Sequence, residues 1–486
     1  MKKIIVPLLA LLLSSIAVSQ NTYKAIIKDS ETQEVLTGAL AIIDGTDKGA
    51  SSDVTGNIQI RDIADGQQII VFRLLGYKER IDTLNFPLIQ TEPFEILLTS
   101  TGEELEEVII ISTRSSRSIT DIPTRVEFIA GEELEEKGNM KPGDIRMILA
   151  ESTGIQTQQT SATSANASIR IQGMDGRYTQ ILKDGFPLYS GASSGLGLLQ
   201  IPPLDLKRVE VIKGSASTLY GGGAIAGLVN LISKIPQKEQ EFKFHFDGTS
   251  AKGLNLSGFY SKLFNKVGTT VFIAHNRNLA YDPANIDLSA IPKFERYTLN
   301  PKIFFYPSKK TDVTFGINTT VEDRIGGDMH FIEEKGDSTH SYFEKNKTER
   351  ISTQFLAEYK FWKCSNVTIK NSLSYFSRIL NTPNYEFNGI QNSTFTEANY
   401  ASHGEKIEWI LGVNLWTDQF YEKQFDSTAL RNYDQVTTGA FIQNTWKVAK
   451  WFNLETGFRT DYVVDYGFTY LPRFSALFKI NQHLTS

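Results

Sequence analysis

The sequence is poor in the residues that build disulfide or metal-bound frameworks. It has one cysteine, Cys364, among 486 residues, so neither a disulfide framework nor a cysteine-based metal site can form within one chain. Its six histidines are His245, His275, His330, His340, His403 and His483. None has the close spacing typical of metal ligands. His330 and His340 are near enough in sequence to share one loop, which is a weak indication of a metal or haem site.

Excess charge of one sign and long apolar runs are also missing. The net charge is -5, from 50 basic and 55 acidic residues that are well mixed. This balance argues against nucleic-acid binding, because that function needs a basic excess. After Leu13 no apolar run reaches the roughly 18 residues that a membrane-spanning helix needs. The mean hydropathy of -0.22 is likewise too low for a helical membrane protein.

Aromatic residues, in contrast, are plentiful. They make up 11% of the chain, with 30 phenylalanines and 19 tyrosines. Membrane barrels carry aromatic girdles at both membrane surfaces, but a large soluble β-protein can have the same bias. The aromatic content alone therefore does not decide between these classes.

The N-terminus predicts a secretory signal over residues 1–19. Lys2 and Lys3 give it a positive start, and Ile4–Leu13 is its apolar stretch. Small residues at Ala17-Val18-Ser19 predict cleavage before the next residue, and no cysteine follows for a lipid anchor. The mature protein is therefore expected outside the inner membrane.

Residues 20–100 predict a separate small β-domain. Short strands such as Tyr23–Lys28 and Gln68–Leu74 are separated by turn signals such as Asp44-Gly45. Turns that recur about every 8–12 residues are typical of an immunoglobulin-like sandwich.

The middle of the chain predicts a small mixed sheet with glycine corners. Its short apolar runs are Ile169–Ile171, Gln180–Leu182 and Val209–Ile212, and Leu228–Ile232 follows three consecutive glycines. Upstream we expect a strand over Pro123–Ile129, helices over Gly131–Lys137 and Lys141–Leu149, and polar loops over Gln156–Ala167 and Phe186–Gln200.

The last part of the chain predicts long antiparallel strands with one apolar and one polar face. Phe242, Phe244 and Phe246 alternate with Lys243 and His245, and about 12 such strands follow a membrane-barrel pattern. Short turns are expected at Phe264-Asn265-Lys266, Pro307-Ser308-Lys309, Trp362-Lys363, His403-Gly404 and Ala449-Lys450. Longer polar connections are expected over Leu279–Glu295, Arg324–Lys347, Thr382–Ser393 and Phe420–Tyr433.

The middle stretch resembles the plug domain of TonB-dependent outer-membrane receptors. The resemblance lies in the order and spacing of Ile169-Arg170…Gly173…Gly176-Arg177, Leu182-Lys183-Asp184-Gly185, Arg208-Val209-Glu210-Val211, Gly214…Ser217…Tyr220-Gly221 and Ala224-Ile225-Ala226-Gly227…Asn230. Gln172 and Ser215 depart from the family pattern, which usually has arginine and proline there. Residues 20–100 similarly resemble the carboxypeptidase-regulatory-like domain that often precedes such plugs.

The resemblance implies a mainly β architecture in several parts. These are a linker with a TonB box over residues 101–120, an α+β plug over residues 121–235, and the N-terminal part of an antiparallel transmembrane β-barrel over residues 236–486. Family barrels have about 22 strands, since a plug of this size needs a wide lumen. About half of them are expected here, so the chain is expected to be truncated.

The TonB box is expected at Glu107, Val108, Ile109, Ile110, Ile111, Ser112 and Thr113. A β-branched segment in a flexible linker can pair as an added strand with the exposed sheet edge of a partner, which can then pull on it. An ordinary strand of the preceding sandwich is the alternative interpretation.

Two further sets of residues are predicted for the plug. Candidate ligand contacts are Gln158, Gln159, Asn166, Tyr189, Ser193 and Leu196 on the two polar loops, which could instead only fill the lumen. Arg170, Arg177, Asp184, Arg208 and Glu210 are expected to form an ion network that orients the plug rather than a catalytic site.

The predicted function is energy-coupled import across the outer membrane, with no catalytic residues, no cofactor and no resident metal. The expected partners are the periplasmic TonB complex, outer-membrane lipid and a scarce small ligand, most simply a ferric siderophore or other metal chelate. Haem and cobalamin remain open. A passive channel or adhesion barrel is the alternative.

An exported enzyme is disfavoured, because Gly191-x-Ser193-x-Gly195 lacks the strand and helix of a nucleophile elbow. Gly221-x-Gly223-x-x-Ala226 likewise leads into a strand rather than the helix of a dinucleotide site.

Overall fold

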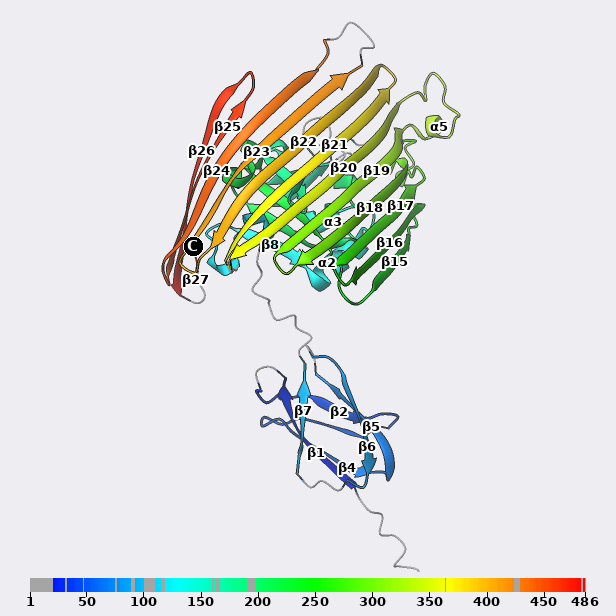
Figure 1. Cartoon of the computed structure of the whole chain (residues 1–486). Coiled ribbons are helices and arrows are strands. Elements are labelled where there is room, and N and C mark those ends of the chain that lie inside the picture. The colour runs from blue at the N-terminus through cyan, green and yellow to red at the C-terminus, as the bar shows by residue number, and fades with distance from the viewer. Residues whose placement is uncertain are drawn as a thin grey trace, which may run out of the picture. The chain divides into compact units, whose positions relative to one another are not determined.

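The structure is a computed structural model that describes most of the chain. It covers residues 21–30, 33–46, 48–74, 77–88, 92–99, 110–115, 119–159, 161, 167–189, 198–362, 364–423, 429–481 and 484–485. The chain divides into two compact units, Met1–Val108 and Ile109–Ser486. Each unit is described by itself (Figure 1).

The first unit is a two-sheet β-sandwich. Its strands are β1 (Asn21–Asp29), β2 (Leu40–Ile43), β3 (Gly49–Ser51), β4 (Asn57–Ile63), β5 (Gly66–Arg73), β6 (Arg80–Phe86) and β7 (Phe94–Leu98). They form the sheets β4-β1-β7 and β3-β2-β5-β6. Alternation along β1 and β5 buries Tyr23, Ile27, Ile70 and Phe72 between the sheets. This confirms the predicted sandwich.

The second unit begins with a short turn and a compact α+β domain, which we call the plug. Its elements are η1 (Ile111–Thr113), η2 (Ile119–Asp121), β8 (Val126–Ala130), α2 (Gly131–Met140), α3 (Arg146–Ala150), β9 (Ile155–Gln159), β10 (Ala167–Ile171), η3 (Gly176–Tyr178), β11 (Thr179–Lys183), β12 (Phe186–Tyr189), β13 (Leu206–Lys213), α4 (Ser217–Tyr220), η5 (Gly222–Ala224) and β14 (Gly227–Ser233). Five strands form a mixed sheet in the order β12-β11-β14-β13-β8, in which β11 and β14 run parallel.

The plug differs from its predicted elements in three places. The loop predicted over residues 186–200 begins with strand β12, which pairs antiparallel with β11. The second helix starts at Arg146 rather than Lys141, because the preceding residues form a turn. The predicted polar loop after Ile155 begins instead with strand β9, which pairs antiparallel with β10. Polar glutamines occupy β9 because its outer positions are exposed, so hydropathy did not reveal the strand.

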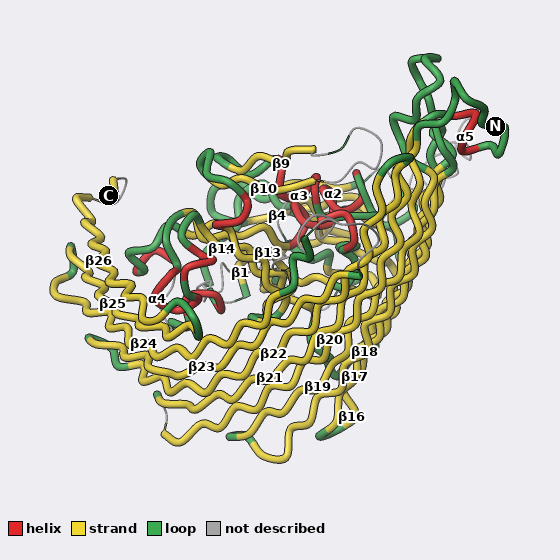
Figure 2. Tube along the Cα trace, turned by 90° about the horizontal axis from the view of Figure 1, so that it is seen from above, coloured by secondary structure: helices red, strands yellow, loops and turns green. Residues whose placement is uncertain are grey.

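The rest of the second unit is one antiparallel wall. Its strands are β15 (Glu241–Gly248), β16 (Gly253–Phe264), β17 (Val267–Asn278), β18 (Lys293–Ser308), β19 (Thr311–Gly327), β20 (Phe343–Trp362), β21 (Ser365–Thr382), β22 (Tyr385–His403), β23 (Ile407–Glu422), β24 (Tyr433–Ala449), β25 (Phe452–Val463), β26 (Gly467–Asn481) and β27 (Leu484–Thr485), with helix α5 (Met329–Ile332) between β19 and β20. The strands are hydrogen-bonded in sequence order. Figure 2 shows them as a curved arc with the plug elements on its concave side.

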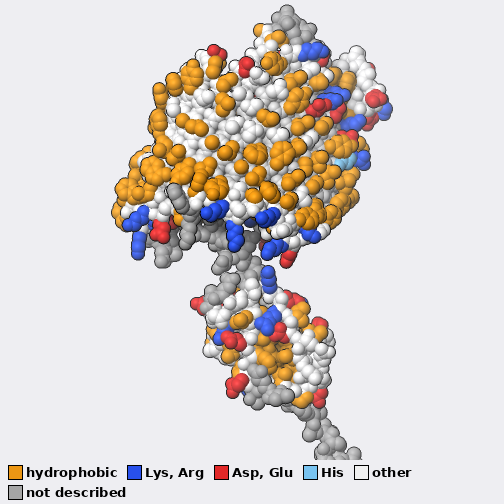
Figure 3. All heavy atoms as spheres, in the orientation of Figure 1, with side chains coloured by type: hydrophobic (Ala, Val, Ile, Leu, Met, Phe, Trp, Pro, Cys, Tyr) orange, Lys and Arg blue, Asp and Glu red, His pale blue; other side chains and the backbone are white. Residues whose placement is uncertain are grey.

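The wall has the predicted two faces. On β15, Phe242, Phe244 and Phe246 are about two-thirds exposed, while the residues between them face the plug side and are partly buried. Hydrophobic side chains cover much of the outward face in Figure 3. Among the described residues, no helix is long and apolar enough to cross a membrane.

One predicted outer loop is wrong. Residues 382–393 form no long connection, because β21 and β22 continue to a tight turn at Pro383-Asn384. Strand β22 is 19 residues long, well beyond the roughly 9–11 residues that cross a bilayer. Its outer part therefore lies beyond the apolar band, where polar residues on both faces conceal a strand pattern.

The glycine at the start of β14 allows a close approach inside the plug. A Cβ on Gly227 would lie 2.4 Å from the Ile212 carbonyl oxygen and 2.9 Å from Ile171 Cδ1. We expect Gly227→Ala to destabilise the plug by about 1–3 kcal/mol, the usual cost of overpacking. Limited proteolysis of the folded protein measures this loss of plug stability. Gly223→Ala, where nothing lies within 4 Å, is the control. Equal protease resistance of the two variants would contradict the packing argument.

Candidate functional site

The segment Ile110–Ser115 is anchored in the plug by a buried carboxylate. Ile111 N and Ser112 N donate hydrogen bonds to Glu210 at 3.1 and 2.8 Å, and Ser112 Oγ donates another at 2.5 Å. Both Ser112 and Glu210 are fully buried. Glu210 lies in the middle of β13, inside the plug sheet, so this segment is tied directly to the plug core.

The same segment is capped by two more plug residues. Tyr220 Oη donates to the Ser112 carbonyl oxygen at 2.8 Å, and Asn230 Nδ2 donates to Ser112 Oγ at 3.1 Å. Ile111–Thr113 forms the 3-10 helix η1 rather than a strand of the sandwich, which removes that alternative for these residues. The predicted TonB-box residues Glu107, Val108 and Ile109 lie outside the described residues.

The next residues fasten the segment to the barrel wall. Arg114 adopts a left-handed backbone conformation, with φ of 56°, and its guanidinium pairs with Glu397 of β22 at 2.9 Å. That guanidinium also lies 5.1 Å from the Tyr220 ring centroid and 5.0 Å from that of Phe441. Ser115 Oγ donates to Glu408 of β23 at 2.5 Å. A six-residue stretch therefore bridges plug and wall.

The five charges predicted as one plug network separate into four sets. Arg208 Nε donates to Glu210 at 2.8 Å, so these two belong to the anchor. Arg177 pairs with Asp175 at 3.1 Å on the exposed helix η3. Arg170, on β10, forms no ion pair with another residue that the structure describes.

Asp184 faces the wall instead of the other plug charges. It pairs with Lys302 of β18 and accepts from Ser233 N at 2.8 Å. Burial alone would raise the pKa of Asp184, but the nearby ammonium groups of Lys302 and Lys183 hold it below its usual range. The carboxylate is therefore ionised and joins plug to wall.

A second plug–wall contact was not predicted from the sequence. Arg296 of β18 is 2% exposed and donates to the carbonyl oxygens of Leu199 and Gly143, on two separate plug segments. It also contacts Asn276 at 2.9 Å and Glu322 at 3.4 Å. The only sequence signal was its place on the polar face of a strand, which does not identify its partners.

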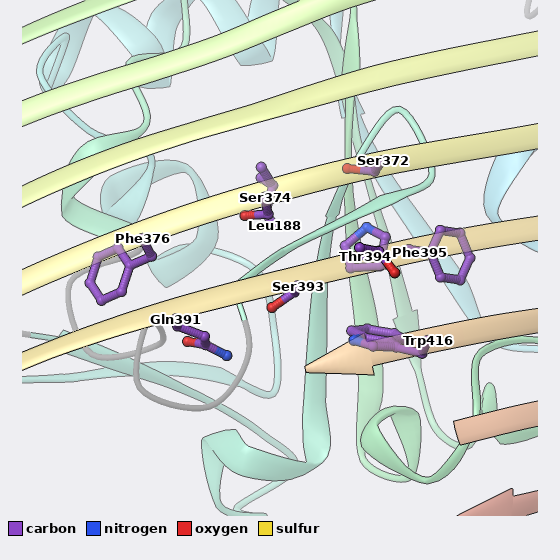
Figure 4. Close-up of a pocket in the computed structure, with 10 residues that line it drawn as sticks. Leu188, Ser372, Ser374, Phe376, Gln391, Ser393, Thr394, Phe395 and Trp416 are labelled. Carbon is purple, nitrogen blue, oxygen red and sulfur yellow. The ribbon is translucent and has the colours of Figure 1, made fainter. Parts of the chain in front are cut away.

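A narrow crevice separates the end of β12 from the wall. It is lined by Pro187 and Leu188 of the plug and by Ser372, Ser374, Phe376, Gln391, Ser393, Thr394, Phe395 and Trp416 of β21–β23 (Figure 4). Its volume is about 20 Å³, enough for little more than one water molecule. Hydroxyl and amide groups beside aromatic rings suit the edge of a larger ligand lying over the crevice.

Polar groups continue along the wall beyond this crevice. Asp418 of β23 accepts hydrogen bonds from Gln391 Nε2 at 2.8 Å, Ser393 Oγ at 2.9 Å and Tyr433 Oη at 3.1 Å. The Tyr433 ring stacks on Phe420, with centroids 5.6 Å apart. These mutual contacts hold the lumen-facing side chains in fixed orientations.

A larger cavity, of about 430 Å³, lies between plug and wall elsewhere. Its plug side is formed by α2 and residues 203–206, and its wall side by β15 and β16. Lys243 of β15 crosses it to pair with Glu135 of α2 at 2.7 Å. The plug is therefore less tightly packed against the first wall hairpin.

The predicted ligand contacts are only partly described. Gln158 and Gln159 are exposed on β9, and Tyr189 ends β12. Asn166, Ser193 and Leu196, like the side chain of Tyr189, lie outside the described residues. The role of all six therefore stays a prediction.

The two histidines expected to share an outer loop do meet. The His330 and His340 rings have centroids 4.3 Å apart, and His340 Nδ1 lies 2.8 Å from Asp328 Oδ2. His330 Nε2 lies 3.8 Å from Asp287 of the neighbouring loop. Within the described ranges, no group of three or more His, Cys, Asp or Glu side chains is arranged to hold a metal ion.

Comparisons with known proteins agree with this architecture. A family model described as the TonB-dependent receptor plug domain matches residues 118–228, and one described as a CarboxypepD_reg-like domain matches residues 26–110. The chain is similar to an iron-regulated outer membrane virulence protein of Vibrio cholerae serotype O1, with 24% identity over 390 residues covering 76% of this chain and 56% of that protein. It therefore spans about half the length of that relative.

Two other relatives are informative. A vitamin B12 transporter of Vibrio cholerae is 25% identical over 148 residues, which cover 30% of this chain and 24% of that protein. Among solved structures, the ferric yersiniabactin uptake receptor of Yersinia pestis aligns with a TM-score of 0.59 at 13% identity, covering 77% of this chain and 65% of that one. At this identity the structural likeness shows the fold.

A mixed-sheet plug against the polar side of a curved wall with an apolar outer face defines a plugged outer-membrane β-barrel protein. The matched plug and CarboxypepD_reg-like domains specify the family further. The chain thus carries the plug domain of TonB-dependent receptors and is similar to outer membrane proteins over most of its length. The relatives named above are an outer membrane protein and a transporter rather than enzymes.

We expect Glu210→Gln to loosen the segment Ile110–Ser115. It weakens three hydrogen bonds to a charged acceptor, each worth about 1.5–3 kcal/mol. A spin label on Ile111→Cys, in a Cys364→Ser background because Cys364 is exposed, should give a narrower spectrum. Arg177→Gln, which breaks an exposed plug pair, should leave the spectrum unchanged. Identical spectra for the Glu210→Gln and Arg177→Gln variants would contradict the role of Glu210 as the anchor of this segment.

The outer-loop histidine contact should depend on pH. The hydrogen bond to Asp328 raises the pKa of His340 above its ordinary value of 6.5, so the contact is present at lower pH and lost as pH rises through the raised pKa. Hydrogen exchange of residues 328–342 should therefore be slowest near about pH 6 and speed up, beyond its intrinsic pH dependence, toward about pH 8. His340→Gln should abolish this additional increase in hydrogen exchange with pH. Protection that increases with pH would contradict this.

Proposed function

We propose that this receptor imports a scarce ligand by energy-coupled movement of the plug, driven through the TonB complex. The observation that carries the proposal is the anchor at Ile110–Ser115, which joins the predicted TonB box to Glu210 inside the plug sheet. A pull on the residues before Ile110 would act first on these hydrogen bonds. Force applied at the periplasm would therefore reach β13 directly.

The plug–wall contacts fit a domain that must be held and yet move. Paired charges such as Asp184 with Lys302 orient buried groups without adding large net stability, because desolvation offsets much of their attraction. A dry apolar interface of the same area would resist displacement more strongly. The cavity of about 430 Å³ beside α2 gives the plug room to shift on that side.

We propose a metal chelate, most simply a ferric siderophore, as the ligand. The support comes from relatives whose names concern iron regulation and ferric siderophore uptake. It also comes from the wall around Trp416 and Phe395, where aromatic rings and hydroxyl groups lie together at the tip of β12. The candidate loop residues Gln158 and Gln159 would contribute from the plug side.

The test separates coupling from binding. Ile109→Pro removes a backbone N–H from the predicted TonB box upstream of the anchor, so it blocks pairing with a partner strand. Ile109→Val preserves pairing and is the matched control. In iron-limited cells expressing each variant, we measure surface binding and uptake of a ferric catecholate, a ferric hydroxamate and cyanocobalamin.

We expect Ile109→Pro to lower uptake to the level of cells without the gene while surface binding persists, and Ile109→Val to keep both. Continued uptake in the proline variant would overturn the coupling proposal in favour of a passive channel. Coupled uptake of cyanocobalamin alone would overturn the chelated-iron proposal while leaving the mechanism intact.

A further inference from the structure

The short turns of the wall carry exposed lysines. Lys266, Lys309, Lys310, Lys406 and Lys450 lie in the turns after β16, β18, β22 and β24, and all five are exposed. None forms an ion pair with another residue in the described part of the chain. We call these five the lysine rim. Figure 3 shows basic side chains gathered along this lower edge of the wall.

Three other lysines at this end are already paired with aspartates. Lys360 pairs with Asp312 and lies near Glu358, while Lys447 and Lys479 both pair with Asp121 where the chain enters the plug. The lysine rim therefore has an excess of positive charge. Its five lysines face a single acidic residue in the same turns, Glu405.

Two outer segments at the opposite end of the wall have the reverse charge. The outer segments 279–292 and 328–342 contain six acidic residues and one lysine, Lys335. Lysines elsewhere at that end differ from the lysine rim in having acidic neighbours, as Lys335 has Glu333 and Lys347 has Glu349.

A band of exposed aromatic side chains lies directly beside the lysine rim. It comprises Phe264, Phe305, Tyr359, Phe361, Trp409, Trp446, Trp451 and Phe478, which are 42–59% exposed. Aromatic bands of this kind sit at the boundary between lipid tails and headgroups. The rim lysines therefore stand at the depth of the lipid phosphates in the adjoining leaflet.

We propose that the lysine rim binds the phosphate groups of anionic glycerophospholipids in the periplasmic leaflet, enriching them around this end of the barrel. Clusters of four to eight basic residues at a membrane surface attract anionic lipids, and long lysine stems can lie along the apolar band while the ammonium reaches the headgroups. The adjoining aromatic band favours a lipid over an acidic protein as the occupant. The proposal does not depend on ligand import.

The tryptophans supply the probe. Trp409, Trp446 and Trp451 belong to the aromatic band, so bromine atoms on neighbouring lipids quench their emission. The protein is reconstituted in phosphatidylcholine vesicles containing about one-fifth phosphatidylglycerol, with bromine placed on one lipid or the other. The ratio of quenching per lipid measures the preference for the anionic headgroup.

The rim variant carries Lys→Gln at positions 266, 309, 310, 406 and 450. The matched control carries Lys→Gln at positions 252, 335, 345, 347 and 423, which are exposed toward the other end and give the same change in net charge. We expect a preference of about twofold for phosphatidylglycerol in the unmodified protein and in the control, and about one in the rim variant.

A ratio of one in the unmodified protein, or an unchanged ratio in the rim variant, would overturn the proposal. If the rim variant does not insert into the vesicles, the proposal is tested by the salt dependence of the lipid preference in the unmodified protein. The preference should disappear at about 1 M salt, where screening acts within about 3 Å, and persistence there overturns the proposal. Competition by millimolar inorganic phosphate would also overturn it, since a free-anion site would then explain the result.

Discussion

The alternation of side chains along the wall strands is the constraint on which the rest of the structure depends. One face must be apolar to meet lipid, and the other is polar, so every charged group on that face needs a partner at membrane depth. Arg296, Lys302, Glu397 and Glu408 find theirs on the plug or on the segment that leads into it. Wall and plug are thus complementary by charge, in addition to small apolar contacts such as that of Leu219 with Ile410 and Phe441.

This complementarity explains why the entry segment is so firmly placed. Ile110–Ser115 supplies backbone N–H groups, two hydroxyls and a guanidinium to three buried carboxylates on β13, β22 and β23. Each carboxylate would be costly to leave without a donor. The same contacts that satisfy the buried charges therefore connect a peripheral linker to the centre of the plug.

The two ends of the wall meet different surroundings. At the outer end, two acidic segments are joined by the His330–Asp287 contact and by backbone bridges such as Leu288–Asp328. At the other end, short turns leave little backbone beyond the strands, and lysines stand beside exposed aromatic rings. Charge asymmetry along the barrel axis is thus built into the lengths and compositions of the connections.

Local sequence determined the elements whose cause is local. The period-two pattern around Phe242–Phe246 and the glycine corners of β13–β14 predicted strands, faces and short turns, because alternation and turn chemistry act over a few residues. This local pattern did not reveal a strand where both of its faces are polar, as along the outer part of β22.

Tertiary structure alone decided which charges meet. Long stretches of chain separate Arg114 from its partner Glu397, and Arg296 from the Leu199 carbonyl oxygen that it contacts. An alternating pattern indicates only that a residue faces the lumen. The expected single network of Arg170, Arg177, Asp184, Arg208 and Glu210 separated for this reason, since β-sheet register and the seating of the plug choose each partner. Composition fixed how many polar groups the lumen holds, and the fold fixed their pairing because hydrogen bonds reach only about 3 Å.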